Sequence, residues 1–307
     1  VLRLAVLSAL AFAPLLFPAA HRAEAADAGA GCAADNGGLS LAPGFCASIF
    51  ADNIGHVRHM VVHDGTLYVN TWSGNYYSGD SLPPGGFVVA LKDTKGGGTA
   101  DAVTRIGPGA QQGNHGGTGI AIWHGYIYAE MNDKIVRYRL PQAGAAPDDK
   151  YEVVVDRIPL GGDHPMHPFV IDAEGHLYLA KGSATNACEK QNRTPYSPGN
   201  NPCTETRTRA GIWRYDAAKL NQTFSPAERY ATGLRNGEGL AFDKAGRLFA
   251  TQHGRDQLSE DWPKLYGTRQ GSELPAEEMV QVTQGADFGW PTCYFDGFQK
   301  KLVLGPE

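Results

Sequence analysis

Residues 239–251 read GLAFDKAGRLFAT: an apolar strand, a turn that contains Gly246, and a second strand of aromatic and small residues. The same pattern occurs three more times, at residues 59–71 (HMVVHDGTLYVNT), 119–130 (GIAIWHGYIYAE) and 168–180 (PFVIDAEGHLYLA). Short apolar runs joined by a glycine turn are typical of β-hairpins. The chain therefore contains a hairpin that is repeated along its length.

A further strand follows each hairpin, and the whole unit recurs. Equivalent positions in the copies are 60, 50 and 71 residues apart (Leu67, Ile127, Leu177, Leu248), and the additional strands lie at residues 86–93, 134–140, 211–217 and 278–283. Multi-stranded units repeated at such intervals are the blades of a β-propeller. We therefore predict an all-β propeller. A β-sandwich is the alternative, but it explains only the alternating strands and not the repeated unit.

The composition agrees with a turn-rich β protein. Of 307 residues, 39 are glycine and 19 are proline, and 42% are hydrophobic, which suffices for a large core and excludes disorder. The net charge of −5 argues against a nucleic-acid-binding protein, because such proteins normally present a basic face.

The N-terminus has the features of a secretory signal. Arg3 precedes an apolar run at residues 4–17, and an A-x-A cleavage pattern ends at Ala25. We therefore predict a signal peptide at 1–25, an opening segment at 26–48 and a propeller at 49–307. The protein is expected to be exported, either periplasmic or secreted, without stable membrane insertion.

Export permits disulfides, and the five cysteines predict two of them. Cys32 and Cys46 bracket a glycine-rich segment, and Cys188 and Cys203 bracket a polar loop, so both pairs are expected to be local. Cys293 has no expected partner in this chain.

Unusual polar residues flank the repeated hairpins. They occur at residues 161–167 (GGDHPMH), 233–238 (GLRNGE), 252–256 (QHGRD) and 113–117 (GNHGG). Loops from several blades converge at the mouth of a propeller, where ligands bind. Histidine, arginine and carboxylates at these equivalent points predict a binding or catalytic site there.

Four stretches carry a resemblance to a known family, at residues 44–62 (GFCASIFADNIGHVRHMVV), 163–183 (DHPMHPFVIDAEGHLYLAKGS), 234–254 (LRNGEGLAFDKAGRLFATQHG) and 287–296 (DFGWPTCYFD). They resemble the soluble quinoprotein glucose/sorbosone dehydrogenases, most closely the sorbosone branch, over roughly residues 40–297. These enzymes are six-bladed propellers that use pyrroloquinoline quinone (PQQ) and calcium. The resemblance implies oxidation of the C1 hydroxyl or aldehyde hydrate of an aldose- or sorbosone-type sugar, by hydride transfer to the quinone, with an external electron acceptor.

The resemblance also implies a role for the histidine loop. His164 falls on the general base that removes the C1 hydroxyl proton, a task suited to imidazole. Asp163 is expected to orient the His164 ring and raise its basicity. His167 is the rival base in the same loop.

Cofactor contacts are implied on the other segments. Arg235 falls on the residue that contacts the quinone oxygens and stabilises developing negative charge, and Asn236 would bond to the same edge. Asn114 falls on a further cofactor or substrate contact. The main-chain carbonyls of Gly254 and Arg255 fall on the calcium ligands. The family commonly has proline at the position of Arg255, so we expect the Arg255 side chain to add a positive charge near the site.

Two other functions remain open. A calcium-dependent sugar lactonase would bind its metal through side-chain carboxylates, which are few here, and would leave the Arg235–Asn236 pair without a role. A non-catalytic carbohydrate- or protein-binding propeller is the other alternative. Neither would bind a quinone.

About four of the six expected blades are accounted for. We therefore expect an incomplete propeller that stops in a loop after Leu304, with the partner of Cys293 and further quinone-binding Lys and Arg residues lying beyond it. Residues 1–307 alone are accordingly expected to show little sugar oxidation.

Overall fold

The computed structural model describes residues 33–72, 84–109, 115–140, 149–273 and 275–307. Residues 50–307 form one compact unit, and a separate unit ends at Ile49 and contains the short 3₁₀ helix η1 (Asn36–Gly38). The predicted signal peptide, Cys32 and Asn114 lie outside the described residues, so the predicted Cys32–Cys46 pair is not described either.

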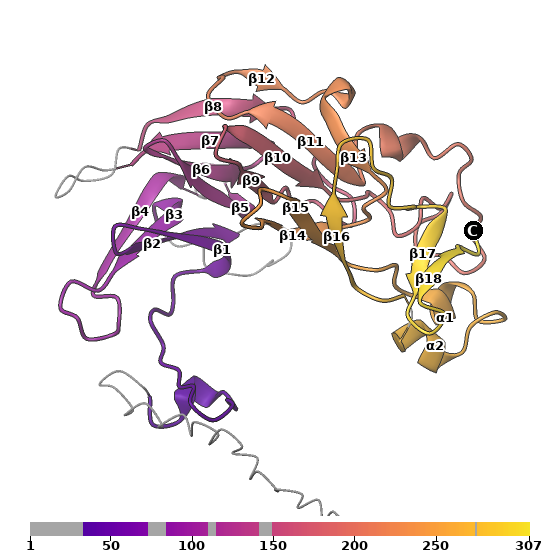
Figure 1. The fold of residues 1–307 in the computed structure, drawn as a ribbon, viewed down its shortest axis with the longest axis horizontal. Coiled ribbons are helices and arrows are strands. Elements are labelled where there is room, and N and C mark those ends of the chain that lie inside the picture. Colours follow the sequence, from indigo (N-terminus) through magenta and orange to yellow (C-terminus); the bar gives the residue numbers. More distant parts are fainter. Residues whose placement is uncertain (1–32, 73–83, 110–114, 141–148, 274) are drawn as a thin grey trace, which may run out of the picture. The chain divides into compact units, whose positions relative to one another are not determined.

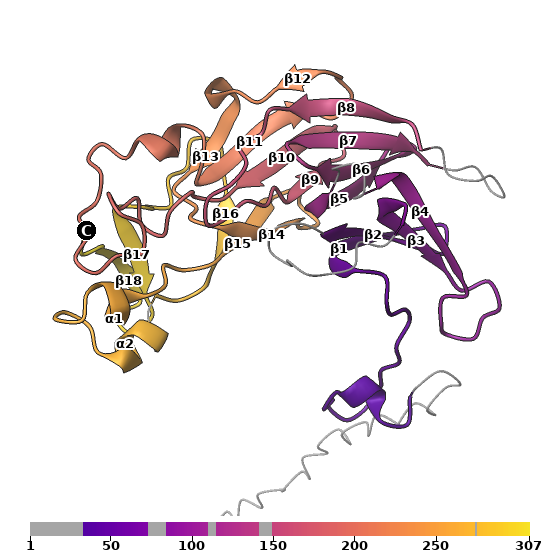
Figure 2. The same ribbon diagram turned by 180° about the vertical axis from the view of Figure 1, so that it is seen from behind.

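The unit from residue 50 onward is built of consecutive blades of mainly antiparallel strands, shown in chain order in Figure 1 and from behind in Figure 2, and a parallel pairing of β2 with β5 joins the first two blades. Blade 1 contains β1 (His56–His63), β2 (Thr66–Trp72), β3 (Gly86–Lys92) and β4 (Ala102–Gly109). Blade 2 contains β5 (Gly116–Trp123), β6 (Tyr126–Met131), β7 (Lys134–Arg139) and β8 (Tyr151–Asp156). Within each blade, neighbouring strands in the sequence pair with one another.

Two further blades follow. Blade 3 contains β9 (Phe169–Ile171), β10 (His176–Lys181), β11 (Gly211–Asp216) and β13 (Arg229–Thr232), and blade 4 contains β14 (Gly237–Phe242), β15 (Leu248–Gln252) and β16 (Glu278–Val282). The short strand β12 (Gln222–Thr223) adds to the outer strand of blade 2. The predicted all-β propeller, with four blades in the part of the chain that the structure describes, is confirmed.

The helices among the described residues are short. Besides η1, they are the 3₁₀ helices η4 (Thr204–Arg207) and η5 (Pro226–Glu228), and the α-helices α1 (Leu258–Asp261) and α2 (Thr268–Glu273). No helix within the described ranges is long and apolar enough to cross a membrane.

The end of the chain differs from the prediction. The sequence predicts a loop at the end of the chain, but β17 (Cys293–Asp296) pairs with β18 (Lys301–Leu304) in an antiparallel hairpin that extends to Leu304. Both views place this hairpin beside α1 and α2, and Tyr294 of β17 packs against Leu258 of α1. The apolar run at residues 293–295 is too short to distinguish a strand from a loop.

The hydrophobic cores lie between the blades. In β6, Ile127 and Ala129 pack with blade 1, whereas the intervening Tyr128 packs with blade 3. Likewise in β10, Leu177 packs toward blade 2 and Tyr178 toward blade 4. Because successive side chains of a strand point to opposite faces, each inner blade contributes to two cores.

Candidate functional site

His164 lies just before β9, and its ring is held by Ser183, which follows β10. The ring Nδ1 lies 2.9 Å from the Ser183 hydroxyl oxygen and 3.1 Å from the Ser183 carbonyl oxygen. A carbonyl oxygen can only accept, so Nδ1 must carry the imidazole proton. In the neutral ring Nε2 then carries the lone pair, and within the described residues it has no hydrogen-bond partner.

The surroundings keep His164 neutral. Burial, followed by the positive charge of Arg235, lowers the pKa of His164 from 6.5 to about 3, although the hydrogen bond with Ser183 opposes this shift. The ring is therefore uncharged at neutral pH, which is the state that a general base requires.

The segment that ends β10 also fixes the backbone of His164. The ammonium group of Lys181 donates to the His164 carbonyl at 2.7 Å, and it is almost fully buried. Gly182 packs directly against the histidine, since a Cβ at this position would lie 2.4 Å from Cβ of His164 and 3.0 Å from Oδ1 of Asn236. Glycine at 182 therefore allows the segment to approach both residues.

Asp163 does not hold the His164 ring as expected. Its carboxylate instead accepts hydrogen bonds from Asn192 (2.9 Å) and from Arg193 Nε (2.6 Å). A guanidinium is a stronger partner for a carboxylate than a neutral imidazole. The orienting contact therefore comes from Ser183, and Asp163 acts on His164 through its charge, which opposes the lowering of the pKa.

Arg235, before β14, sits at the centre of the site and is 3% exposed. Its Nε and Nη2 donate to the carbonyl and side-chain oxygens of Asn186 at 3.0 and 2.9 Å, and Nη2 also bonds to Asp256 at 3.0 Å. Nη1 donates to the Gly254 carbonyl at 2.8 Å. A guanidinium has five N–H groups, so within the described residues one N–H of Nη1 remains for a ligand.

The segment after β15 brings the Gly254 carbonyl beside Arg235. The Gly254 carbonyl accepts from Arg235, and no hydrogen bond to the Arg255 carbonyl is found among the described residues. The expectation of a positive charge from the Arg255 side chain is wrong. That side chain is 4% exposed and forms ion pairs with Asp261, at 3.4 Å, and with Glu307.

Asn236 directly follows Arg235 in the sequence, and Glu238 lies two residues further on, with a side-chain hydrogen bond to Asn236. Asn236 is buried, with its side chain against Gly182, and its carbonyl accepts from the His253 amide at 3.0 Å. Burial raises the pKa of Glu238, and Oε1 of this residue is enclosed without a hydrogen-bond partner among the described residues.

His167 is placed differently from His164. Its Nδ1 lies 2.6 Å from Oε1 of Glu130 in β6, and its Nε2 is enclosed without a described partner. Burial alone would raise the pKa of Glu130, but His167 and the donated N–H groups lower it to about 2, while burial lowers the pKa of His167. The contact between Glu130 of blade 2 and His167, which lies just before β9, thus joins blades 2 and 3. This arrangement favours His164 as the base.

Most of the predicted site residues therefore come together. His164, Arg235, Asn236, Gly254 and Arg255 surround one region, with Asp163 linked to it through the bonds of Arg193 to Asp163 and Asp256. Ser183, Asn186 and Arg193 were missed. These residues belong to a cluster of polar residues directly after β10, and this cluster is recognised as part of the site only once the contacts are known.

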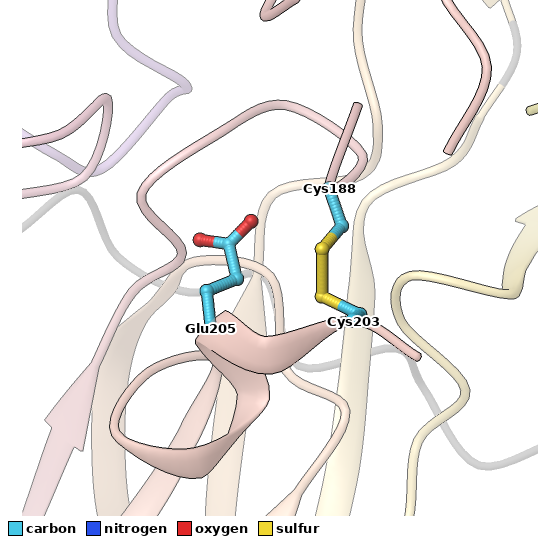
Figure 3. Close-up of side chains that lie close together, drawn as sticks. All are labelled: Cys188, Cys203 and Glu205. Atoms are coloured by element: carbon cyan, nitrogen blue, oxygen red, sulfur yellow. A yellow bond between two sulfur atoms is a disulfide. The ribbon is translucent and has the colours of Figure 1, made fainter. Parts of the chain in front are cut away.

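The disulfide between Cys188 and Cys203 is confirmed, and Cys293 is a free cysteine as expected. Cys188, Cys203 and Glu205 have their sulfur and oxygen atoms within 4.8 Å of one another. Figure 3 shows the three side chains. The sulfurs are bonded to each other and are not thiolates, so this group is not a metal site.

The fold defines a class, the β-propellers. Within it, the model of the TrAA12-like family matches residues 39–302, so the chain belongs to this family. The predicted relationship to the propeller sugar dehydrogenases is confirmed at this level. No curated protein matches the chain.

Solved structures share the fold at low sequence identity. Two of Trichoderma reesei Carbohydrate-Active Enzymes Family AA12, described as an iodide and a calcium structure, have TM-scores of 0.62 and 0.60 at 20% identity, covering 80% of this chain and 58% of theirs. The holo pyranose dehydrogenase PQQ domain from Coprinopsis cinerea has a TM-score of 0.59 at 16% identity, covering 80% and 56%. The chain thus spans less than two thirds of each of these structures.

Proposed function

We propose that the protein is a sugar dehydrogenase that uses PQQ and calcium, with His164 as the base. The observation that carries this proposal is the state of the His164 ring: neutral, protonated on Nδ1, and with an Nε2 lone pair that has no partner within the described residues. This is the arrangement needed to take a proton from a sugar hydroxyl. Family membership and the PQQ domain among the similar structures support the same activity.

Calcium suits the donors that the site offers. The Gly254 carbonyl has a single described donor and the Arg255 carbonyl has none within the described residues, so both retain lone pairs. Oxygen atoms are the ligands that calcium prefers. We propose that these two carbonyls hold the ion, and a calcium-containing AA12 structure is among the similar ones.

A quinone suits the polar groups beside these carbonyls. The remaining N–H of Arg235 and the buried Asn236 amide can donate to quinone oxygens, and Asn114, which lies outside the described residues, is proposed as a further contact. When bound, PQQ would supply the acceptor for the hydride of the sugar.

Each residue of the site would then have a separate role. His164 Nε2 accepts the proton of the C1 hydroxyl, and the Ser183 contact keeps the ring oriented while it does so. Arg235 carries a fixed positive charge, because four of its N–H groups are held by the protein, and it stabilises negative charge on a neighbouring acceptor. Asp163 opposes the charge of Arg235 at the base.

The finer assignments also belong to this proposal. The substrate is an aldose- or sorbosone-type sugar with an external electron acceptor, and the N-terminal signal pattern supports export to the periplasm or the medium. A lactonase is less well supported, because Asp163 and Asp256 are engaged with Arg193 and Arg235 and are not arranged as a carboxylate metal site.

Binding and turnover test the proposal separately. Titration of PQQ and calcium into the protein should shift the quinone absorbance spectrum. His164→Gln should retain this shift, and in a chain that oxidises sugar it should abolish dye-linked oxidation, a loss of at least about a hundredfold in kcat. Absence of a spectral shift would favour a lactonase or a binding propeller, and unchanged turnover in His164→Gln would remove this residue from its role.

A further inference from the structure

The Ser183 hydroxyl presents only acceptor positions to His164. The hydroxyl donates its proton to the Thr185 carbonyl at 2.6 Å. The main-chain carbonyl of Ser183 also accepts from the His164 amide at 3.3 Å. The ring nitrogen facing it must therefore donate. The hydroxyl and the carbonyl of Ser183 together therefore place the proton of the His164 ring on Nδ1.

The segment that follows Ser183 is held by the Glu205 carboxylate of η4. Oε2 accepts from the Ala184 amide at 2.6 Å, and Oε1 accepts from the Thr185 hydroxyl. Charged acceptors make stronger hydrogen bonds than neutral ones. Each carboxylate oxygen of Glu205 thus fixes one of the two residues after Ser183.

The disulfide anchors Glu205 itself. Cys203 directly precedes η4, and the amide of its partner Cys188 donates to the Thr185 hydroxyl at 2.8 Å. Figure 3 shows the Glu205 side chain beside this disulfide. A continuous set of bonds therefore leads from the disulfide to the ring of His164.

We propose that Glu205 is a positioning residue for the base: by holding Ser183 in place, it fixes the imidazole proton of His164 on Nδ1. Nε2 is thereby left to accept a proton. The catalytic consequence rests on the proposed function, whereas the position of the proton does not.

The first experiment measures the proton directly, without cofactor or substrate. Protein with ¹⁵N-labelled histidine gives long-range ¹H–¹⁵N correlations that distinguish Nδ1–H from Nε2–H, and a His164→Gln variant identifies the signals of this ring among the ten histidines. At neutral pH the native protein should show His164 as the Nδ1–H form. Glu205→Gln, which replaces one accepting oxygen by an NH₂ group, should produce a measurable Nε2–H population.

Glu228→Gln is the matched control. Glu228 is also an acidic residue in the first turn of a 3₁₀ helix, but it is exposed on η5. It should leave the His164 signals unchanged. If Glu205→Gln fails to fold, judged by circular dichroism, Thr185→Val removes the hydroxyl link at nearly constant volume and decides the question by the same measurement. Native signals in a folded Glu205→Gln or Thr185→Val protein would overturn the proposal.

The second experiment measures turnover. In the quinone-loaded protein, Glu205→Gln should lower kcat for sugar oxidation about ten- to a hundredfold through misplacement of the base, with less change in KM. A tautomer shift in Glu205→Gln without a quinone absorbance shift in the native protein would contradict the proposed function and support the positioning role. Full activity with an unshifted tautomer in Glu205→Gln would contradict the positioning role alone.

Discussion

The side chain that holds His164 lies 19 positions further along the chain, at Ser183. The histidine loop and the Arg235–Asn236 pair could be predicted from the sequence, because unusual residue types recur beside repeated hairpins. The partners of these residues could not. Asp163 is the nearest candidate in sequence, but Arg193 engages it, and the contact with Arg193 spans 30 residues. Such contacts depend on how loops fold back, which no local pattern encodes.

Lys181 has a measurable effect on stability because its ammonium group is buried. Burial and Arg209 lower its pKa from 10.5 to about 7, against opposing effects of Glu130 and Glu238. Between pH 7 and 10.5 the unfolded chain therefore binds more protons at this residue than the folded one. The contribution of Lys181 to the free energy of unfolding is fully present above pH 10.5 and is lost as the pH falls toward 7.

The effect of Lys181→Met on the free energy of unfolding should therefore depend on pH. Relative to the variant, the native protein should gain free energy of unfolding as the pH rises from about 7 to 10, since the cost of burying the charge disappears. Denaturant unfolding at several pH values measures this difference. Lys244→Met, at an exposed position, is the control. A difference between native and Lys181→Met that does not change with pH would contradict the expectation.

At the scale of elements, the three inner strands of each blade were predictable and the outer strand was not. The hairpins and the strand after them are apolar runs bounded by glycine, and β3, β7, β11 and β16 begin where the sequence predicts. The outer strands β4, β8 and β13 were missed. β4 contains Gly107, Pro108 and Gly109, and β13 has four residues, so neither carries a strand pattern of its own. They form strands because a paired neighbour is available.

The Cys188–Cys203 loop is the element that supports the site from outside the blades. It supplies Asn192 and Arg193 to Asp163, and it closes a separation of 15 residues. A Cys188→Ala/Cys203→Ala variant should lose about 3 kcal/mol of unfolding free energy, the entropy of a loop of this length.

Thermal and denaturant unfolding of that double variant would measure the loss. Cys293→Ala, which removes a free thiol, is the matched control and should change stability by less than about 1 kcal/mol. Equal stability of the native protein and the double variant would show that the loop keeps its conformation without the bond.

At the scale of the molecule, the cores between blades couple the blades to one another. Leu177 is fully buried between blades 2 and 3, so Leu177→Ala should cost about 2–5 kcal/mol. Because the cores are shared, tryptophan fluorescence and circular dichroism should follow one and the same shifted transition. Met279→Ala, at a side chain that is 74% exposed, should stay within about 0.5 kcal/mol of the native protein. Separate transitions for the two probes would contradict this coupling.

The shared cores also bear on how the chain is made. During synthesis, blade 1 emerges before the strands of blade 2 that complete its core, such as Ile127 and Ala129 of β6. Each blade released from the ribosome therefore finishes the packing of its predecessor and presents one new unfinished face. The chain and the folded structure then grow in the same direction. At each stage, the exposed face of the most recently folded blade is not yet packed against a following blade.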